Sequence, residues 1–399
     1  MENHNWTQPG TQSSPQQIFN NVNAPYITSL VTPGNANATN TAYATAYYHP
    51  GQSEHPSEPN YVWAEAGTNF NQFTPNAAGG GVSTLGGPTN TTQGTINGTR
   101  IANDNDPGAT SGNIFPASAA AQHLSGQLNA AGISWKNYEE DYQILNSTTP
   151  TGGSALVSKS GTSTTVQNPY NGSFQFNYAA KHNPMAFFAD TATQNVAPMS
   201  QLQTDLNNNT VGQYNWITPN QYNDMHTALT GGYSPIDGSG QHTLPTVTGD
   251  NANIRQGDDF LKQVVPLIMA SQAYQNNGAI IIWNDETEGG DDANHTSMEI
   301  VISNLAKGNA FASSVVMNHS SDIRTMEELF GLPFIDNPIP MSETFATGGF
   351  ATVLGSNDLS DLFLAGAIPS AVPEPASLGL LGLGAVGVLA RRRTTNKNA

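Results

Sequence analysis

Two adjacent carboxylates, Asp285 and Glu286, directly follow the apolar run and asparagine at residues 280–284. Three isoleucines and a tryptophan without polar alternation predict a strand buried on both faces, as at the centre of a parallel sheet. Such strands deliver ligand-binding side chains at their carboxyl ends. Because two like charges held side by side repel, we expect this pair to bind a metal ion. A solvated acidic loop is the alternative interpretation.

Ser57 lies in the stretch His-Pro-Ser-Glu-Pro-Asn-Tyr, residues 55–61, just ahead of a segment with a helical pattern. The dipole and free N–H groups of a helix N-terminus favour an anion and lower the cost of an alkoxide. A serine at this position is therefore suited to be a nucleophile that attacks phosphorus. A serine that only caps the helix explains the same pattern, and the local sequence alone favours that interpretation.

Further residues with ligand chemistry are spread along the chain. Carboxylate, amide and imidazole groups are the donors that hard and borderline cations take in proteins. An Asp and a His two positions apart after a predicted strand end can converge on one ion. The candidates are Glu2, Asn3, His182, Asp224, His226 and His319. A frayed terminus for the first two and a structural role for His182 among aromatic residues are the alternatives.

The composition restricts the class of partner. The 399 residues are 37% hydrophobic and only 11% charged, which suits a folded protein with long polar loops rather than a disordered one. With 12 basic residues and a net charge of −18, the chain is a poor partner for nucleic acid. It contains no Cys. A metal site must therefore use oxygen and imidazole ligands, which suit Ca, Mg, Mn or Zn.

The pattern of elements predicts an α/β protein. Helices are expected at residues 117–131, ending at Gly132, and at residues 258–276. Strands are expected at residues 133–138, 214–218 and 299–303. Ser321 or Asp322 is expected to cap a helix over residues 323–330, which Gly331 ends. Strands alternate with helices, and the candidate ligands fall at strand ends.

The C-terminus has a composition of its own. A Val-Pro-Glu-Pro stretch at residues 372–375 precedes an apolar run at 376–390 and an arginine cluster at 391–393. This order resembles the PEP-CTERM sorting tail. The resemblance implies export in a Gram-negative bacterium, to the envelope or extracellular matrix. It also implies a C-terminal helix in the inner membrane until an exosortase processes the tail. A plain tail anchor is the alternative.

The ordered set of motifs in residues 1 to about 335 resembles the phosphoesterase family of acid phosphatases and phosphatidylcholine-type phospholipases C. The pieces that carry the resemblance are Glu2-Asn3, His55 to Tyr61, Gly132 to Tyr138, His182-Asn-Pro184, Asp224-Met-His226, Asp285-Glu286 with Gly289-Gly290, and His319 to Pro333. The implied fold is an alkaline-phosphatase-like sandwich, with a mostly parallel central sheet between helices.

The resemblance also implies roles for these residues. Glu2, Asn3, Asp285 and Glu286 match metal ligands, and Ser57 matches the nucleophile that forms a phosphoserine. His182, Asp224, His226 and His319 resemble groups that bind the phosphate or a second metal. Asp285 to Gly290 is one residue longer than the family's usual pattern, and this leaves a role for His295 in doubt.

Three functions follow from these expectations. The first is an exported, metal-dependent phosphomonoesterase, the second a phospholipase C that cleaves phosphodiesters, and the third an inactive surface or matrix protein on the same fold. We expect a catalytic domain at 1–340, a linker at 341–371 and the sorting segment at 372–394. Family members have an apolar strand before the Met-Glu-Asn match, so we also expect an upstream strand and a signal peptide.

Overall fold

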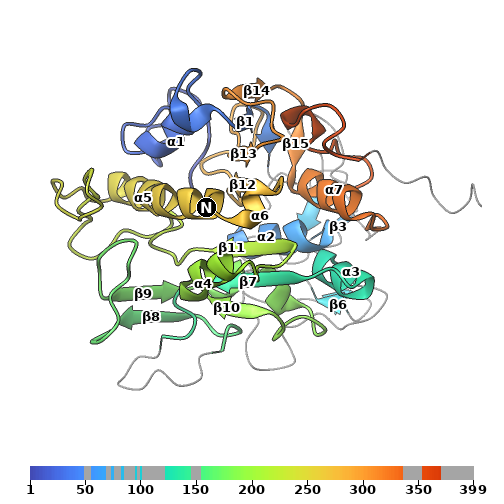
Figure 1. Ribbon diagram of the computed structural model, residues 1–399, viewed down its shortest axis with the longest axis horizontal. Helices are drawn as coiled ribbons and strands as arrows, with labels where there is room; N and C mark the ends of the chain where they lie inside the picture. Colours follow the sequence, from blue (N-terminus) through green and yellow to red (C-terminus); the bar gives the residue numbers. More distant parts are fainter. Residues whose placement is uncertain are drawn as a thin grey trace, which may run out of the picture.

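The computed structural model describes residues 1–48, 55–68, 122–144, 154–335 and 353–369, and the backbone of four short strands between residues 73 and 100. Within these residues the chain forms seven α-helices and several sheets (Figure 1). The predicted mixed α/β class is confirmed.

The larger sheet has four strands in the order β12 (Ala279–Trp283), β13 (Glu299–Ser303), β1 (Thr41–Ala44) and β14 (Phe311–Ser313). β13 pairs antiparallel with both β12 and β1, and β1 pairs parallel with β14. β13 is buried along its whole length. Its alternating side chains serve two cores, because Ile300 packs on one face of the sheet and Val301 on the other.

The expectation of a central parallel strand at 280–284 was wrong. β12 lies at the edge of the described sheet, pairs antiparallel with β13, and buries fully only Ile282. An apolar run reveals that a strand forms, but it carries no information about the direction of its partner. The expected mostly parallel central sheet is likewise not what this sheet shows.

A second sheet, of three strands, is parallel throughout. Its order is β10 (Val196–Pro198), β7 (Trp135–Glu139) and β11 (Tyr214–Thr218), with β7 in the centre and both pairs parallel. The last two strands confirm those expected at 133–138 and 214–218. The remaining strand pairs are β15 (Met317–Asn318) with β2 (Tyr47–Tyr48), β8 (Lys159–Thr162) with β9 (Gln175–Tyr178), β3 (Phe73–Pro75) with β4 (Val82–Thr84), and β5 (Thr95–Ile96) with β6 (Thr99–Arg100).

The two main sheets share one hydrophobic core. In Figure 1 the four-stranded sheet lies above and the three-stranded sheet below, with α5 (Asp250–Met269) between their levels. Phe260 of α5 packs in the same cluster as Ile300 from the first sheet and Tyr138 from the second. The other helical segments are α1 (Pro25–Leu30), η1 (Ala36–Ala38), α2 (Ser57–Ala66), α3 (Leu124–Ala131), η3 (Ala180–His182), η4 (Pro184–Phe187), α4 (Ser200–Asn208), α6 (Gln272–Gln275), α7 (His319–Phe330) and η5 (Ser360–Leu362).

Three helices differ in their bounds from the sequence prediction. The helix expected at 117–131 begins at Leu124 with His123 as its N-cap, and it ends at Gly132 as expected. The helix expected at 258–276 begins at Asp250 and ends at Met269, after which Ser271 caps the short α6. α7 begins four residues before the expected position because Asn318, not Ser321 or Asp322, is its N-cap. The Asn318 side chain accepts from Ser320 N at 2.8 Å, and Ser321 Oγ accepts from Asn318 N at 3.0 Å. The expected end at Gly331 is confirmed by its φ of 63°.

The second face of the four-stranded sheet is covered by residues 359–368. Leu359, Leu362 and Phe363 are buried there against Ala42 and Val301. Part of the segment predicted as a linker is thus folded onto the sheet. The predicted sorting segment at 372–394 lies outside the described residues. Among the described helices, none combines the length and the apolar character needed to cross a membrane.

Candidate active site

Ser57 is the first residue of α2, and Pro56 is its N-cap. All ten residues of α2 are buried, and the helix packs against α7, η3 and η4. It ends at Gly67, whose φ of 66° is in the left-handed region. The serine hydroxyl therefore lies at the N-terminus of a buried helix, where the helix dipole favours negative charge.

Hydrogen bonds fix the rest of this helix. Trp63 Nε1 donates to Ser320 Oγ of α7 at 2.8 Å. Two turns beyond Ser57, the Glu65 carboxylate accepts from Ser125 N at 2.7 Å and lies 2.9 Å from His123 Nδ1. These contacts tie α2 to α3 and α7, so that the position of Ser57 is set by the surrounding fold.

Glu2 reaches the site through backbone contacts on both sides. Its N–H donates to the Asp224 carbonyl at 2.7 Å. The amino group of Met1 donates to the Trp283 carbonyl at 2.8 Å, and Asp285 N donates to the Met1 carbonyl at 3.2 Å. The first two residues therefore lie between the end of β12 and the segment after β11. This position brings the Glu2 side chain close to Asp285 and Glu286.

The Ser57 hydroxyl meets carboxylates from two distant parts of the chain. Its Oγ lies 3.0 Å from Glu2 Oε2 and 3.2 Å from Glu286 Oε1. The sequence separations are 55 and 229 positions. The structure thus brings together the serine, the N-terminal carboxylate and the acidic pair at the end of β12, as the resemblance to the phosphoesterase family implied.

Asp285 is the least satisfied of these acids. It is fully buried, and neither of its carboxylate oxygens has a hydrogen-bond partner. Burial, followed by the charges of Glu2 and Glu286, raises the pKa of Asp285 well above its ordinary value. Burial also raises the pKa of Glu286 to about 7, although His55 acts against this. Charged carboxylates at this density are unfavourable unless a cation lies among them.

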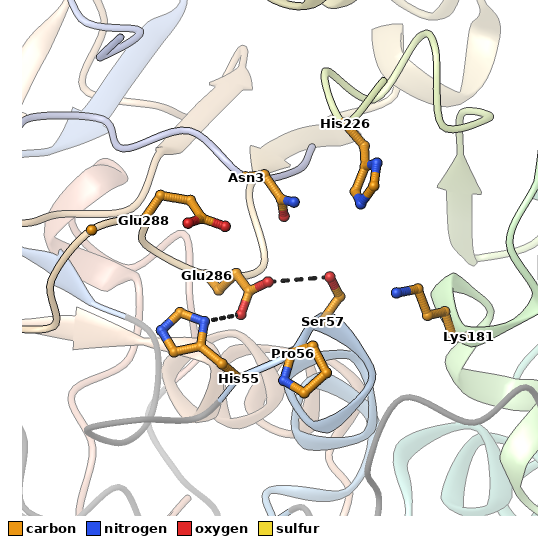
Figure 2. Close-up of a pocket in the computed structure, with 9 residues that line it drawn as sticks. Asn3, His55, Pro56, Ser57, Lys181, His226, Glu286 and Glu288 are labelled. Atoms are coloured by element: carbon orange, nitrogen blue, oxygen red, sulfur yellow. Dashed lines mark hydrogen bonds and ion pairs between the residues drawn. The ribbon is translucent and has the colours of Figure 1, made fainter. Parts of the chain in front are cut away.

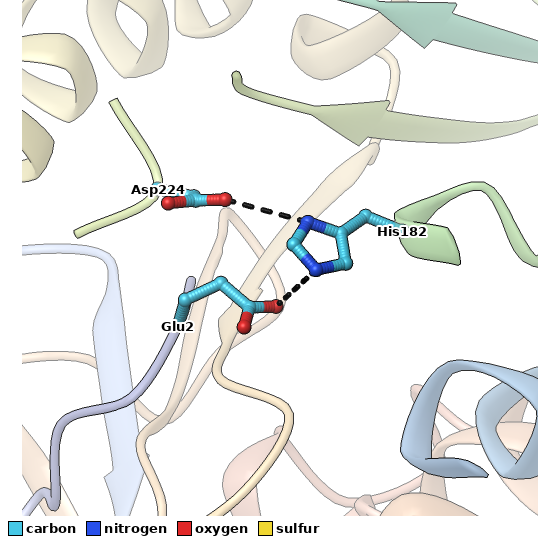
Figure 3. A group of neighbouring side chains, drawn as sticks. All are labelled: Glu2, His182 and Asp224. Carbon is cyan, nitrogen blue, oxygen red and sulfur yellow. Dashed lines mark ion pairs between the residues drawn. The ribbon is translucent and has the colours of Figure 1, made fainter. Parts of the chain in front are cut away.

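His182 bridges two of the predicted ligands (Figure 3). Its Nε2 lies 3.5 Å from Glu2 Oε1, and its Nδ1 lies 3.5 Å from Asp224 Oδ2. Burial lowers the pKa of His182 to about 3, so the ring is neutral at neutral pH. Tyr61 stacks on the ring at 4.8 Å between centroids, and its hydroxyl donates to Glu2. His182 and Tyr61 together hold the Glu2 carboxylate in place.

Among the described residues, two overlapping sets of side chains lie close enough together to hold a metal ion. In each set, every residue offers one ligand atom, and these atoms all lie within 4.8 Å of one another. The sets are Glu2, Asp285 and Glu286, and Glu2, His182 and Asp224. Asp285, Asp224 and Asn3 each have a buried oxygen that lacks a hydrogen-bond partner and is available as a metal ligand. These residues fit a divalent cation held mainly by oxygen.

The site opens into a pocket of about 500 Å³ (Figure 2). Asn3, whose φ of 51° is left-handed, presents its amide at the pocket, and His226 borders it from the segment after β11. The lining residues are Asn3, His55, Pro56, Ser57, Lys181, His226, Glu286, Glu288 and Gly289. The pocket therefore joins the serine to several of the predicted ligands and gives a substrate access to them.

His55 and Lys181 are pocket residues to which the sequence analysis gave no role. His55 Nδ1 contacts Glu286, and its Nε2 lies 2.9 Å from Asp291 Oδ1. Burial lowers the pKa of His55, but the contacts with Asp291 and Glu286 outweigh it and raise the value to about 11. His55 is the first residue of one motif that the sequence analysis quoted, and Lys181 directly precedes another, so these positions were the available signal.

His319 lies beneath the acidic pair and does not line the pocket. Its Nε2 is 2.7 Å from the Asp285 carbonyl oxygen, and its Nδ1 is 3.1 Å from the Tyr47 hydroxyl. His295 contacts Asp292 and Gln12, each at 2.8 Å. Both histidines support the loop that carries Asp285 and Glu286.

Parts of the chain are similar to known proteins. The sequence model of the Phosphoesterase family matches residues 2–234, which is more than half of the chain. The chain belongs to the phosphoesterase family. This phosphoesterase is also similar to the phosphatidylinositol-3-phosphatase of Mycobacterium tuberculosis (strain ATCC 25618 / H37Rv), at 24% identity over 316 residues, covering 79% of this chain and 73% of the relative. The family and this relative identify a phosphoric ester hydrolase.

The PEP-CTERM protein-sorting motif matches residues 371–393, which confirms the resemblance at the C-terminus. The family match ends at residue 234, before β12. Asp285 and Glu286 are therefore joined to the site by the geometry described above rather than by that match.

Proposed function

We propose that this phosphoesterase is a metal-dependent phosphomonoesterase of acid-phosphatase type, with Ser57 as its nucleophile. The observation that carries the proposal is the position of Ser57 Oγ. It lies at the N-terminus of a buried helix, 3.0 Å from Glu2 Oε2 and 3.2 Å from Glu286 Oε1. A hydroxyl held in this way beside a pocket has both an acceptor for its proton and a field that favours its anion.

Glu2, Asn3, Asp285 and Glu286 would hold the divalent cation, and Asp224 with His182 supports the far side of Glu2. Their oxygen-rich donor set fits Ca, Mg, Mn or Zn. When bound, such an ion polarises phosphoryl oxygens and stabilises an ionised serine. The unsatisfied oxygens of Asp285 support this assignment.

The reaction proposed for the chain's own residues has two displacements. Ser57 Oγ gives its proton to one neighbouring carboxylate and forms a bond to phosphorus, while the bond from phosphorus to the alcohol oxygen breaks in line and the alcohol leaves with that proton. Water then attacks the phosphoserine, the bond between Oγ and phosphorus breaks, a proton of the water returns to Ser57, and inorganic phosphate leaves. His226 at the pocket contributes hydrogen bonding to the equatorial oxygens.

Two histidines are assigned supporting roles. His182 orients Glu2 through its contacts with Glu2 and Asp224. His319 holds the backbone carbonyl of Asp285 and so fixes the loop that carries the acidic pair. A serine at a helix N-terminus facing carboxylates at a strand end also supports the proposal of an alkaline-phosphatase-like fold.

The test uses the purified full chain with each of the four metals and two substrates, p-nitrophenyl phosphate and its phosphorylcholine ester. We expect faster turnover of the first ester, a phosphate adduct on Ser57 detectable by mass spectrometry after acid quenching, and loss of both in Ser57→Ala. The name of the mycobacterial relative favours the monoester. Faster turnover of the choline ester would establish the phospholipase C alternative. Unchanged turnover in Ser57→Ala would remove the nucleophile.

We also propose that an exosortase-type enzyme processes the chain after export, with the apolar run at 376–390 as an inner-membrane helix until then. The sorting motif at 371–393 supports this proposal. Cell fractions from a strain with and without its exosortase test it. We expect the unprocessed chain to accumulate in the inner membrane only when the exosortase is absent, and identical masses in both strains would contradict the proposal.

A further inference from the structure

Lys181 is the only Lys or Arg among the nine residues that line the pocket. Figure 2 shows its ammonium end directed into the pocket on the side of Ser57 opposite Glu286. The whole chain has only 12 basic residues against 30 acidic ones. A lysine is a strongly hydrated point charge that usually remains on the open surface. Its position beside the reacting hydroxyl therefore requires an explanation.

The backbone fixes the direction of this side chain. Lys181 is the middle residue of η3, and its neighbours Ala180 and His182 are both buried. Ala180 N donates to Ser158 Oγ at 2.8 Å, and His182 N donates to the Ala179 carbonyl at 3.1 Å. With both neighbours directed into the protein, the half-buried Lys181 side chain leaves η3 on the pocket side.

Both walls of the pocket carry a basic side chain. On one wall, His55 contacts Glu286 and Asp291. Lys181 is on the other wall, beside the pocket edge formed by Ser57 and His226. An anion bound over Ser57 would therefore meet the carboxylates and their cation on one side and an ammonium group on the other.

We infer that Lys181 binds a non-bridging oxygen of the phosphoryl group and makes the site selective for phosphomonoesters over phosphodiesters. The inference rests on the proposed function. A monoester carries between about −1.5 and −2 charges at pH 7, whereas a diester carries a single negative charge and has an organic group on one of these oxygens. An ammonium donor contributes more to the dianion, because a charge-assisted hydrogen bond strengthens with the charge on its acceptor.

The experiment compares full-length wild type with Lys181→Gln and Lys181→Arg. Lys307→Gln is the matched control, because Lys307 pairs with Asp361 on the surface and is not a pocket residue. Turnover is measured with p-nitrophenyl phosphate and bis(p-nitrophenyl) phosphate in the presence of the activating metal. Binding of inorganic phosphate to the same proteins is measured by calorimetry.

We expect Lys181→Gln to lower kcat/KM for the monoester about 10- to 100-fold and to change that for the diester less than about 3-fold. Phosphate binding weakens in parallel, while Lys181→Arg and Lys307→Gln remain close to wild type. Equal losses for both esters, or equal losses in the Gln and Arg variants, would overturn the inference. If the wild type turns over neither ester, the proposed function fails, and phosphate binding alone then decides whether Lys181 is an anion ligand.

Discussion

Asp258 and Asp285 are both fully buried aspartates, and their surroundings are opposite. The Asp258 carboxylate accepts from Tyr26 N at 3.0 Å and from Ile27 N at 2.8 Å at the start of α1. Neither oxygen of Asp285 has a hydrogen-bond partner, and Glu2 and Glu286 are its charged neighbours. The carboxylate of Asp258 is thus satisfied by hydrogen bonds from the backbone. We propose that Asp285, which has no such hydrogen bonds and lies beside like charges, binds a ligand from outside the chain.

Two further acids show how the fold satisfies a carboxylate in other ways. Glu140 accepts from Asn223 Nδ2 at 2.8 Å, Asn168 Nδ2 at 2.5 Å and Asn220 N at 2.8 Å. Glu65 is paired with His123 and accepts from Ser125 N. Amides, backbone N–H groups and an imidazole are all used for these two acids, whereas neither oxygen of Asp285 has such a partner, and the same holds for Glu299 on β13.

The largest expected effect follows from replacing the unsatisfied acid. Asp285→Ala is expected to lower kcat/KM by more than about 100-fold, since even outer-shell partners of a metal ligand are typically worth 10- to 100-fold. In metal-free buffer its free energy of unfolding should equal or exceed that of the wild type, because a repulsive buried charge is removed. Steady-state kinetics and urea unfolding measure both quantities. A metal-free variant markedly less stable than the wild type would mean that Asp285 serves the fold.

Metal removal should have the next largest effect. Dialysis against a chelator is expected to abolish turnover and to lower the unfolding free energy by about 2.7 kcal/mol relative to protein at a metal concentration of 100 Kd. Differential scanning calorimetry with and without metal checks this. The Asp285→Ala variant should show no such difference, and an equal response in that variant would place the ion elsewhere.

The satisfied acid should show the reverse pattern. Asp258→Ala leaves the N–H groups of Tyr26 and Ile27 without an acceptor, and we expect a loss of about 0.5–2 kcal/mol of stability. Its kcat/KM is expected to stay within about 2-fold of the wild type, as effects at distant, independent sites do not couple. Parallel urea unfolding and kinetic assays measure the two effects. A large kinetic loss would show that the distinction between the two aspartates is wrong.

A smaller, pH-dependent effect is expected where Glu65 is paired with His123. Burial lowers the pKa of His123, but Asp190 and Glu65 outweigh it and raise the value to about 9. A raised folded-state pKa stabilises the fold fully below the unfolded value of about 6.5, and this contribution is lost as the pH rises through about 9. The stability difference between the wild type and His123→Gln should therefore be larger at pH 6 than at pH 10. A difference independent of pH would mean that His123 contributes packing only.

The sequence predicted the parts of the site that depend on local pattern. Ser57 precedes a helical segment and Asp285 follows an apolar run, and both patterns have direct physical causes. The edge position and antiparallel pairing of β12 depend on long-range partners, which a short run cannot encode. The N-cap at Asn318 was missed because Ser321 and Asp322 compete with it in composition, and only the backbone geometry decides between them.

The pocket side chains were the hardest to predict. His55 has its role through Glu286 and Asp291, which lie 231 and 236 positions away. Lys181 faces the pocket because both of its neighbours in η3 are buried, a fact visible only once the fold is known. The spacing of residues along the chain does not show which distant side chains become neighbours in the folded protein.

The segment that covers the sheet, residues 359–368, lies close to the sorting motif. Its buried residues Leu359, Leu362, Phe363 and Ile368 pack on the outer face of β1 and β13, and the sorting motif begins at residue 371. A cut at or after residue 371 would remove the sorting motif and leave the apolar side chains that cover the sheet within the folded protein. Only a few peptide bonds separate the residues that are removed from those that the fold needs.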